Sequence, residues 1–278
     1  MIDYELKNGL NIHLHKNDID RIEYVKGLEP TEQIMSAYRR LGCDLIINAN
    51  FYSMAQDKWY GYPSGQLWDE GKMLSNYELS KYGYGFNGKD LPVFDKENSL
   101  KNKDFVGFYP TLVKDGKISI DTNEYGFSAT STQKRGRTCV GSYKDTFVIR
   151  CVSDSIFTKR YSIPEMAQMM INNGCVNAGN FDGGGSTQWV FSINGKIISK
   201  HITSRPVDGF ICCWLKKEKD ENNQNKSTQD YITHIVQKGE YLSLIAKKYN
   251  TTYQKIATDN GIKYPYTVYT GQKLKIYK

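Results

Sequence analysis

The chain has 278 residues, enough to bury a substantial core as one large domain or as a large domain with a small one. Its low mean hydropathy, 21 tyrosines and short apolar runs exclude a protein that spans a bilayer with helices. The net charge of +7 is uneven, since residues 1–215 and 216–229 each carry +1 and residues 230–278 carry +5. A basic tail is typical of proteins that bind nucleic acid, but it would bind an anionic bacterial surface equally well.

The N-terminus, Met1 to Lys7, has no apolar segment of signal-peptide length, so we expect synthesis in the cytoplasm and another exit route for any extracellular role. The cysteines form no Cys-x-x-Cys pair, which argues against a zinc site or a redox motif. We expect reduced, buried thiols at Cys43, Cys139, Cys151, Cys175, Cys212 and Cys213.

Residues 1–215 are rich in strand-forming segments and predict an α+β domain with mixed sheets. The predicted strands are Leu10–His15, Asp44–Ile47, Phe105–Val113, Thr138–Val140, Thr146–Val152, Trp189–Ile193 and Lys196–Ser199. Helices are predicted at about Pro30–Leu41 and at Ser162–Asn173. The second helix has Ser162 as N-cap, and Glu165 is best explained as its capping-box partner.

Two asparagines follow the strand at Asp44–Ile47. Asn48 and Asn50 share a face by the two-residue period, so both amides would meet a ligand. A pair of turn-forming asparagines is the alternative. Further on, Ser64 and Gly65 lie in a segment that looks like a loop closing over a pocket, although a hairpin fits it as well.

Arginines and a second carboxylate come next in the chain. Arg135 and Arg137 stand just ahead of a strand, where a guanidinium suits bidentate contact with phosphate, while a surface cation is the commoner role. Asp154 follows the strand Thr146–Val152 and is a candidate carboxylate. Arg205 precedes the last strand of the domain and adds another positive group.

The most informative stretch is Asn180-Phe181-Asp182-Gly183-Gly184-Gly185-Ser186-Thr187. It lies between two strand-like runs, so we expect the three glycines to interrupt a sheet, at a cost in sheet stability. Glycines there favour close approach of the backbone to a ligand, with N–H groups lining an anion-binding concavity. Asp182 would place a carboxylate at its edge.

Several other motifs fail. Gly83 to Gly88 fits G-x-G-x-x-G, yet no helix pattern follows, so dinucleotide binding is rejected. G-x-S-x-G and H-E-x-x-H are missing, which removes the commonest serine hydrolases and zinc proteases. The four histidines have no recognisable metal partner, and we predict no cofactor. Divalent cation binding through Asp182 and the asparagines is left open.

Residues 216–229 contain no apolar side chain and predict a linker between two domains. Residues 230–278 predict the order strand, helix, helix, strand. Three stretches of the tail sequence together resemble a LysM module, namely Val236 to Leu242, Asn260-Gly261-Ile262 and Gly271 to Ile276. That resemblance implies binding of N-acetylglucosamine-containing glycans in two loops, here with Gly239, Glu240, Tyr241, Leu242 and Ile262. Glu240-Tyr241 departs from the common Asp-Thr.

Over most of residues 40–215, the ordered set of motifs resembles the phosphodiester glycosidase family. The set comprises Asn48-Ala49-Asn50-Phe51, Pro63-Ser64-Gly65, Arg137-Thr138 with Gly141, Ile163 to Ala167, Asn180 to Ser186 and Arg205-Pro206-Val207. The resemblance implies hydrolysis of a sugar-1-phosphate diester by attack at the anomeric carbon. Asp182 would act toward that carbon, with Asp154 as a second carboxylate. Arg137 and the amides of Gly183 to Ser186 would cradle the phosphate.

The remaining candidates would bind the substrate, with Asn48, Asn50 and Ser64 orienting the sugar; the full set adds Gly65, Asn180, Gly183, Gly184, Gly185, Ser186 and Arg205. With a glycan-binding tail, we expect a hydrolase of bacterial wall glycopolymers, peptidoglycan or teichoic-acid-like, that comes from a phage lysin or virion. A peptidoglycan glycosidase and a non-catalytic wall-adhesion protein are the alternatives. Nucleic-acid binding is least favoured, because the tail lacks an RNA-type aromatic signature.

Overall fold

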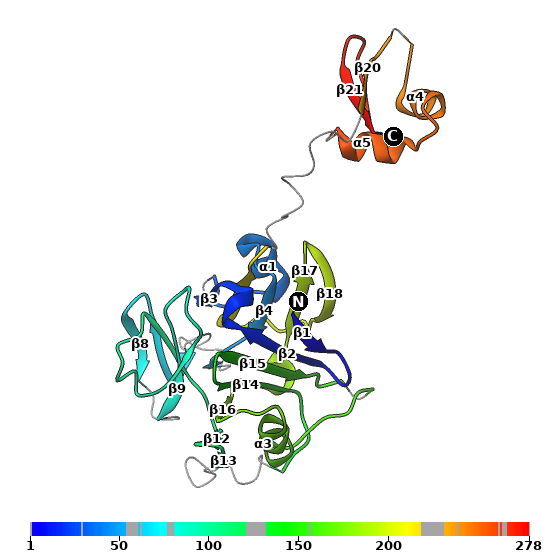
Figure 1. Cartoon of the computed structure of the whole chain (residues 1–278). Helices are drawn as coiled ribbons and strands as arrows, with labels where there is room; N and C mark the ends of the chain where they lie inside the picture. Colours follow the sequence, from blue (N-terminus) through cyan, green and yellow to red (C-terminus); the bar gives the residue numbers. More distant parts are fainter. Residues whose placement is uncertain are drawn as a thin grey trace. The chain divides into compact units, whose positions relative to one another are not determined.

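The structure is a computed structural model that describes residues 2–28, 30–53, 61, 63–76, 81–120, 132–155, 157–217, 231–237, 239–260, 262 and 266–277. The chain divides into two compact units, residues 1–217 and residues 218–278 (Figure 1). Most of the predicted linker, residues 218–229, lies outside the described residues.

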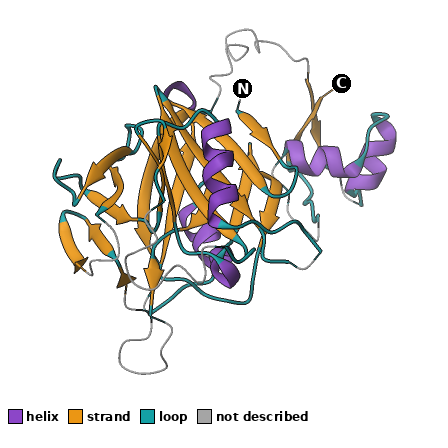
Figure 2. Cartoon of the chain, turned by 90° about the horizontal axis from the view of Figure 1, so that it is seen from below, coloured by secondary structure: helices purple, strands orange, loops and turns teal. Residues whose placement is uncertain are grey.

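A seven-stranded sheet forms one layer of the large unit, in the order β1-β2-β15-β14-β16-β12-β13. Its strands are β1 (Asp3–Glu5), β2 (Leu10–His15), β12 (Thr111–Lys114), β13 (Lys117–Ile118), β14 (Arg137–Tyr143), β15 (Thr146–Val152) and β16 (Asn177–Asn180). Helix α3 (Ile163–Asn172) packs its Met166 and Met170 on one face of this sheet, and it crosses in front of the strands in Figure 2.

A five-stranded sheet faces the first one, in the order β18-β17-β4-β19-β3. Its strands are β3 (Ile19–Lys26), β4 (Leu45–Asn48), β17 (Trp189–Ile193), β18 (Lys196–His201) and β19 (Gly209–Leu215). Helix α1 (Ile34–Leu41) covers its outer face through Ile34 and Ala37. The short 3-10 turn η1 (Lys16–Asp18) joins β2 to β3.

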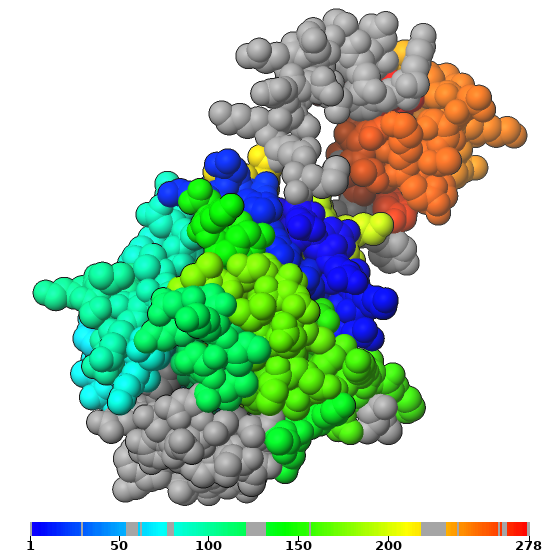
Figure 3. Space-filling model, turned by 60° about the horizontal axis from the view of Figure 1, so that its bottom comes forward, coloured from blue at the N-terminus to red at the C-terminus, as the bar shows by residue number. Residues whose placement is uncertain are grey.

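A third sheet has the order β10-β9-β11-β7-β8. Its strands are β7 (Gln66–Asp69), β8 (Lys72–Asn76), β9 (Tyr82–Phe86), β10 (Val93–Lys96) and β11 (Asp104–Gly107), while β5 (Phe51–Tyr52) pairs with β6 (Pro63–Ser64) separately. The surface of this cyan-to-teal region adjoins the green region that follows it in the chain (Figure 3). The central core takes side chains from all three sheets, for example Phe147, Ile47 and Tyr84.

The sequence prediction of mixed sheets is wrong, because every strand pairing in the described ranges is antiparallel. The predicted strand Phe105–Val113 is two strands, β11 and β12, in different sheets, and the chain turns between them at the cis Tyr109–Pro110 bond. Helix α1 begins at Ile34, not near Pro30, because Glu32 instead pairs with Val207 as an isolated bridge.

Helix α3 confirms its prediction. The Ser162 hydroxyl accepts a hydrogen bond from the Glu165 amide, and the Glu165 carboxylate accepts one from the Ser162 amide, which completes the capping box. The six cysteines are all buried and unpaired, as expected. No helix in the described ranges has the length and apolar character that crossing a membrane requires.

The tail has the order β20 (Tyr231–Ile235), α4 (Leu242–Lys248), α5 (Tyr253–Asp259) and β21 (Lys273–Tyr277). The two strands pair antiparallel, with His234 opposite Leu274. Both helices turn apolar faces inward, because Ile245 and Ile256 are buried together with Leu274 and Ile276. The tail therefore has a core of its own.

Candidate active site

The segment Asp182–Thr187, called the glycine turn below, leads from β16 in the seven-stranded sheet to β17 in the facing sheet. The glycines therefore connect two sheets and do not interrupt one, which corrects the expectation from the sequence. Gly184 has φ +59 and opens the 3-10 turn η2 (Gly184–Ser186). That conformation suits glycine because a Cβ would be strained there.

Hydrogen bonds within the protein already engage most of the amides of this turn. The Gly183 amide donates to the Asp182 carboxylate at 2.8 Å, the Gly184 amide to the Gly136 carbonyl at 2.8 Å, and the Ser186 amide to the Gly183 carbonyl at 3.1 Å. Only the Gly185 amide lacks an acceptor within the described part of the chain. Of the four N–H groups expected to cradle a phosphate, the structure leaves one for a ligand.

Asp182, Ser186 and Arg205 form a polar cluster on the turn. Burial raises the pKa of the Asp182 carboxyl to about 6, although hydrogen bonds from the Ser186 hydroxyl and the Gly183 amide and the charge of Arg205 act in the opposite direction. The Arg205 Nη1 donates to the Ser186 Oγ at 3.3 Å. Asp182 itself is half-buried, so an acid with a raised pKa stands beside an arginine at a surface that solvent reaches.

The position of Arg205 depends on the glycine beside it. A Cβ on Gly185 would lie 3.0 Å from the guanidinium carbon of Arg205, so any larger residue would push the arginine away. The Thr203 hydroxyl donates to the Gly185 carbonyl at 2.9 Å, and the Gln188 amide group donates to the Arg205 carbonyl at 2.8 Å. The segment that carries Arg205 is thus fastened to the turn on both sides.

Arg137, the predicted centre of the phosphate cradle, is the first residue of β14 and is buried. Its guanidinium donates to the backbone carbonyls of Tyr161 at 3.3 Å and of Gln133 at 2.8 Å, and burial lowers its pKa. These contacts tie the start of β14 to the segment before α3. They direct at least two of its donors to the protein and away from a ligand.

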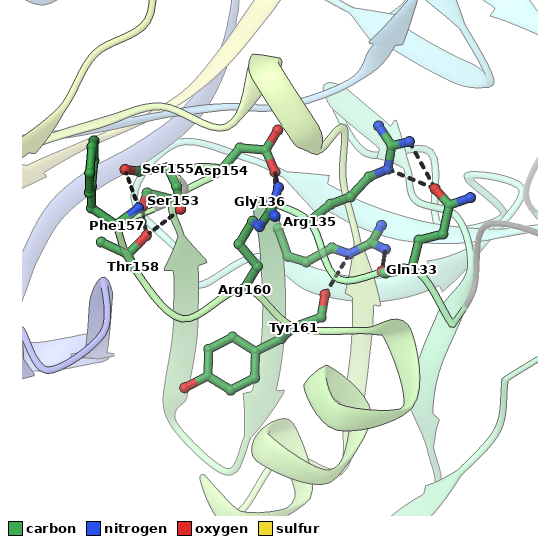
Figure 4. A network of polar contacts seen from close by, with 11 residues as sticks. Gln133, Arg135, Gly136, Ser153, Asp154, Ser155, Phe157, Thr158, Arg160 and Tyr161 are labelled. Atoms are coloured by element: carbon green, nitrogen blue, oxygen red, sulfur yellow. Dashed lines mark hydrogen bonds and ion pairs between the residues drawn. The ribbon is translucent and has the colours of Figure 1, made fainter.

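Gly136 links Asp154 to the glycine turn. The Asp154 Oδ1 accepts from the Gly136 amide at 2.7 Å (Figure 4). The Gly136 carbonyl in turn accepts from the Gly184 amide at 2.8 Å. Arg160 forms a long ion pair with the same carboxylate at 3.9 Å. The side chain keeps 29% of its surface exposed, so its second oxygen remains near solvent.

The three predicted asparagines bind protein atoms. Asn48 donates to the Asp182 carbonyl at 2.7 Å and accepts from the Thr138 hydroxyl and the Gln188 amide. Asn50 donates to Asp208 at 2.7 Å and accepts from Tyr24. Both amide groups therefore bind atoms of the protein.

Asn180 is also turned inward, since its amide group donates to the carbonyls of Tyr109 and Phe181. Ser64 is half-buried in β6 and pairs with Phe51, the residue after Asn50, while Gly65 follows with φ +97.

Two residues near this region were not predicted from the sequence. Asp208 is fully buried, binds Asn50 and pairs with Lys26 at 3.4 Å, and it directly follows the Arg205-Pro206-Val207 motif. His201 packs on Trp189 with ring centroids 4.9 Å apart. Burial lowers the His201 pKa and the charge of Asp154 raises it. The motif signalled the neighbourhood of Asp208, whereas no pattern in the sequence pointed to His201.

In the tail, the predicted glycan residues differ in exposure. Tyr241 exposes 59% of its surface and Gly239 has φ +88, while Leu242 is buried and Ile262 packs partly against the tail core. The Glu240 carboxylate accepts from His234 Nε2 and from the Gln237 amide, both at 2.7 Å. Hydrogen bonding to the Gln237 amide is the main cause of its lowered pKa. Glu240 thus shapes the loop that presents Tyr241.

Within the described ranges, no three or more His, Cys, Asp or Glu side chains are arranged to hold a metal ion.

Comparisons with known proteins agree with the division of the chain. Residues 41–213 match the family model described as phosphodiester glycosidase, and residues 234–276 match the LysM domain model. The catalytic domain of zebrafish N-acetylglucosamine-1-phosphodiester alpha-N-acetylglucosaminidase, auto-inhibited by its pro-peptide, has a similar fold. Its TM-score is 0.58 at 18% identity, over 78% of this chain and 82% of that one.

A hypothetical protein from Synechocystis shares the fold, with a TM-score of 0.59 at 14% identity over 74% of this chain and 59% of that one. In the tail, 43 residues are 56% identical to the N-acetylmuramoyl-L-alanine amidase sle1 of Staphylococcus aureus strain USA300. A similar match to the Staphylococcus saprophyticus protein has 52% identity over 44 residues. These matches cover 16% of this chain and only 13% of each amidase.

Proposed function

The chain belongs to the phosphodiester glycosidase family and ends in a LysM domain, and from this we propose that it hydrolyses sugar-1-phosphate diesters, of the N-acetylglucosamine-1-phosphate type, in bacterial wall glycopolymers. The family makes it a glycosidase-type hydrolase. The observation that carries the proposal is the contact of Arg205 with Ser186 beside Asp182, on a turn whose glycine leaves room for the arginine.

The reaction requires a group that acts on the anomeric carbon and a group that receives the departing phosphate. The oxygen of water bonds to C1, and the bond between C1 and the bridging phosphate oxygen breaks. The products are the free sugar and a phosphate monoester. Ionised Asp182 acts toward C1, either as the nucleophile or as the base for water. Phosphate leaves more readily than an alkoxide, so stabilising its charge matters more than protonating it.

We assign that stabilisation to Arg205 in place of Arg137. Arg205 is half-buried at the turn, and its guanidinium contacts Ser186, whereas the Arg137 guanidinium donates to two backbone carbonyls. A guanidinium suits a phosphate because its fork of donors matches two oxygens. The Gly185 amide, which points to no acceptor in the described part of the chain, adds one further donor.

The LysM domain supports a wall polymer as the substrate. Such domains bind glycans that contain N-acetylglucosamine, and tethering raises the effective concentration of nearby linkages. The staphylococcal proteins that match the tail are named N-acetylmuramoyl-L-alanine amidases. The excess positive charge of the tail would also favour an anionic polymer.

The test is to incubate the whole chain with purified wall polymers and with a synthetic N-acetylglucosamine-1-phosphate methyl diester, and to identify products by mass spectrometry. We expect free sugar and a phosphate monoester, and neither from the Asp182→Asn variant. Reducing sugar from phosphate-free peptidoglycan alone would favour a peptidoglycan glycosidase. Wall binding without any product would favour an adhesion protein.

A further inference from the structure

Residues 153–155 and 157–160, which follow β15 and are called the rim segment, lie close to the glycine turn. Two hydrogen bonds connect it to the turn through Gly136, whose amide donates to Asp154 at 2.7 Å and whose carbonyl accepts from Gly184 at 2.8 Å. Whatever binds at the turn therefore has the rim segment as a neighbour.

Hydrogen bonds inside the rim segment fix its shape. The hydroxyls of Ser153 and Thr158 bond to each other, and the Ser155 carbonyl accepts from the Thr158 amide at 3.2 Å and from its hydroxyl at 3.1 Å. The Phe157 amide donates to the Ser155 hydroxyl at 3.1 Å. The amide of Phe157 is therefore tied to Ser155, the residue that follows Asp154.

Phe157 exposes 91% of its surface, the largest fraction of any large apolar side chain in the described part of the chain. Single exposed apolar residues are ordinary, so exposure alone means little. Here, however, Phe157 and Asp154 project to the same side, beyond the ends of the strands, and Arg135 lies on the other side of Asp154 (Figure 4). The Arg135 guanidinium donates from its Nε and Nη2 to the side-chain oxygen of Gln133.

An exposed aromatic ring on the same segment as a carboxylate, with an arginine on the other side of that carboxylate, suits a carbohydrate that carries negative charge. The apolar C–H face of a sugar packs on an aromatic ring, and its hydroxyls bind carboxylates. We propose that the rim segment is a second subsite, which binds the sugar on the alcohol side of the phosphodiester, with Phe157 stacking on that sugar. This inference rests on the proposed function and adds the identity of the group beyond the phosphate.

The test compares two diesters of N-acetylglucosamine-1-phosphate in the whole chain, one with a methyl group as the alcohol and one with a hexose. Phe157→Ala should lower kcat/KM about tenfold for the hexose diester and leave the methyl diester within twofold, since only the first reaches the ring. Phe157→Tyr should retain activity on both. Leu100→Ala, which alters another exposed apolar side chain with 61% exposure, is the matched control.

Equal losses on both diesters, or no loss on either, would overturn the subsite. The same variants are also titrated with the hexose phosphate that the reaction would release, and Phe157→Ala should raise its dissociation constant about tenfold. An unchanged dissociation constant overturns the subsite even if neither diester is cleaved. Failure of the subsite is therefore distinguishable from failure of the proposed function, which shows as a parent chain that cleaves neither diester.

Discussion

The side chain of Asn48 donates a hydrogen bond of 2.7 Å to the backbone carbonyl of Asp182, 134 positions later in the chain. The same side chain accepts from Thr138 in β14 and from the amide of Gln188 before β17. One buried amide group thus joins both large sheets to the turn that carries the candidate carboxylate. The Asn48 side chain therefore positions the backbone of Asp182.

Asn48→Ala should therefore destabilise the large unit. The change leaves the buried Thr138 hydroxyl and Gln188 amide without their acceptor, and we expect a loss of about 2–4 kcal/mol in unfolding free energy. Urea denaturation followed by circular dichroism measures it. Asn76→Ala, at an exposed position in β8, serves as the control. A loss under about 0.5 kcal/mol would show that the hydrogen bonds of Asn48 do not stabilise the large unit.

Asp182→Asn should remove activity and stabilise the fold. We expect turnover to fall at least about a hundredfold. The parent carboxyl has a pKa of about 6 against 3.8 in an unfolded chain, so folding disfavours its ionised form. That penalty is absent below pH 4, grows between pH 4 and 6 and is full above pH 6.

The amide oxygen of the variant can still accept from Gly183, so the variant should match the parent at pH 4 and exceed it by up to about 3 kcal/mol at pH 7.5. Thermal unfolding at a series of pH values measures the difference. A variant that is less stable than the parent at pH 7.5 would contradict the raised pKa.

The pH dependence of kcat/KM should rise through about pH 6, because Asp182 acts in its ionised form. The charge of Arg205 holds this pKa down, so Arg205→Gln should move the rising limb to higher pH while lowering its plateau. Steady-state rates on the methyl diester from pH 4.5 to 8.5 test both. A limb that stays in place, or that moves to lower pH, would separate Arg205 from Asp182.

The two arginines should respond differently to substitution by alanine. Arg205→Ala should leave the melting temperature within about 3 °C of the parent and lower kcat/KM on the diester by about a hundredfold or more. Arg137→Ala should lower the melting temperature clearly, because it removes a buried guanidinium that donates to the carbonyls of Tyr161 and Gln133. Full activity of the Arg205 variant would favour a glycosidase that needs no phosphate.

Tyr241 gives a test of the tail. Tyr241→Ala should reduce retention on isolated cell walls several-fold and leave hydrolysis of the methyl diester unchanged, because this small substrate needs no wall contact. Leu244→Ala, another exposed residue of the tail, is the control. Sedimentation with walls measures retention. Equal retention of the Tyr241 variant and the parent would exclude Tyr241 from the glycan contact.

Local signals in the sequence predicted the elements that depend on neighbouring residues. Ser162 and Glu165 mark the start of α3 because both partners of the capping box lie within four residues. The predicted strands Trp189–Ile193 and Lys196–Ser199 are joined by Asn194-Gly195, a pair typical of hairpin turns, and they pair as β17 and β18 with positive φ at both turn residues. The strand at Thr146–Val152 was recognisable from its apolar run alone.

Contacts between distant residues could not be predicted in this way. A strand pattern does not say which strand pairs with it, so the break between β11 and β12 and their places in separate sheets were missed. The direction of the Arg137 side chain depends on carbonyls at positions 133 and 161, which carry no side-chain signature. The Gly184 amide was expected to be free, because its acceptor, the Gly136 carbonyl, lies 48 positions earlier.

The glycine turn leads directly into β17, whose Trp189 stands opposite Ile47 in β4 and opposite His201 in β18. Adding or removing one residue in the turn would shift this register by one and exchange the inward and outward faces of the whole strand. The length of the turn is consequently as constrained as the core itself.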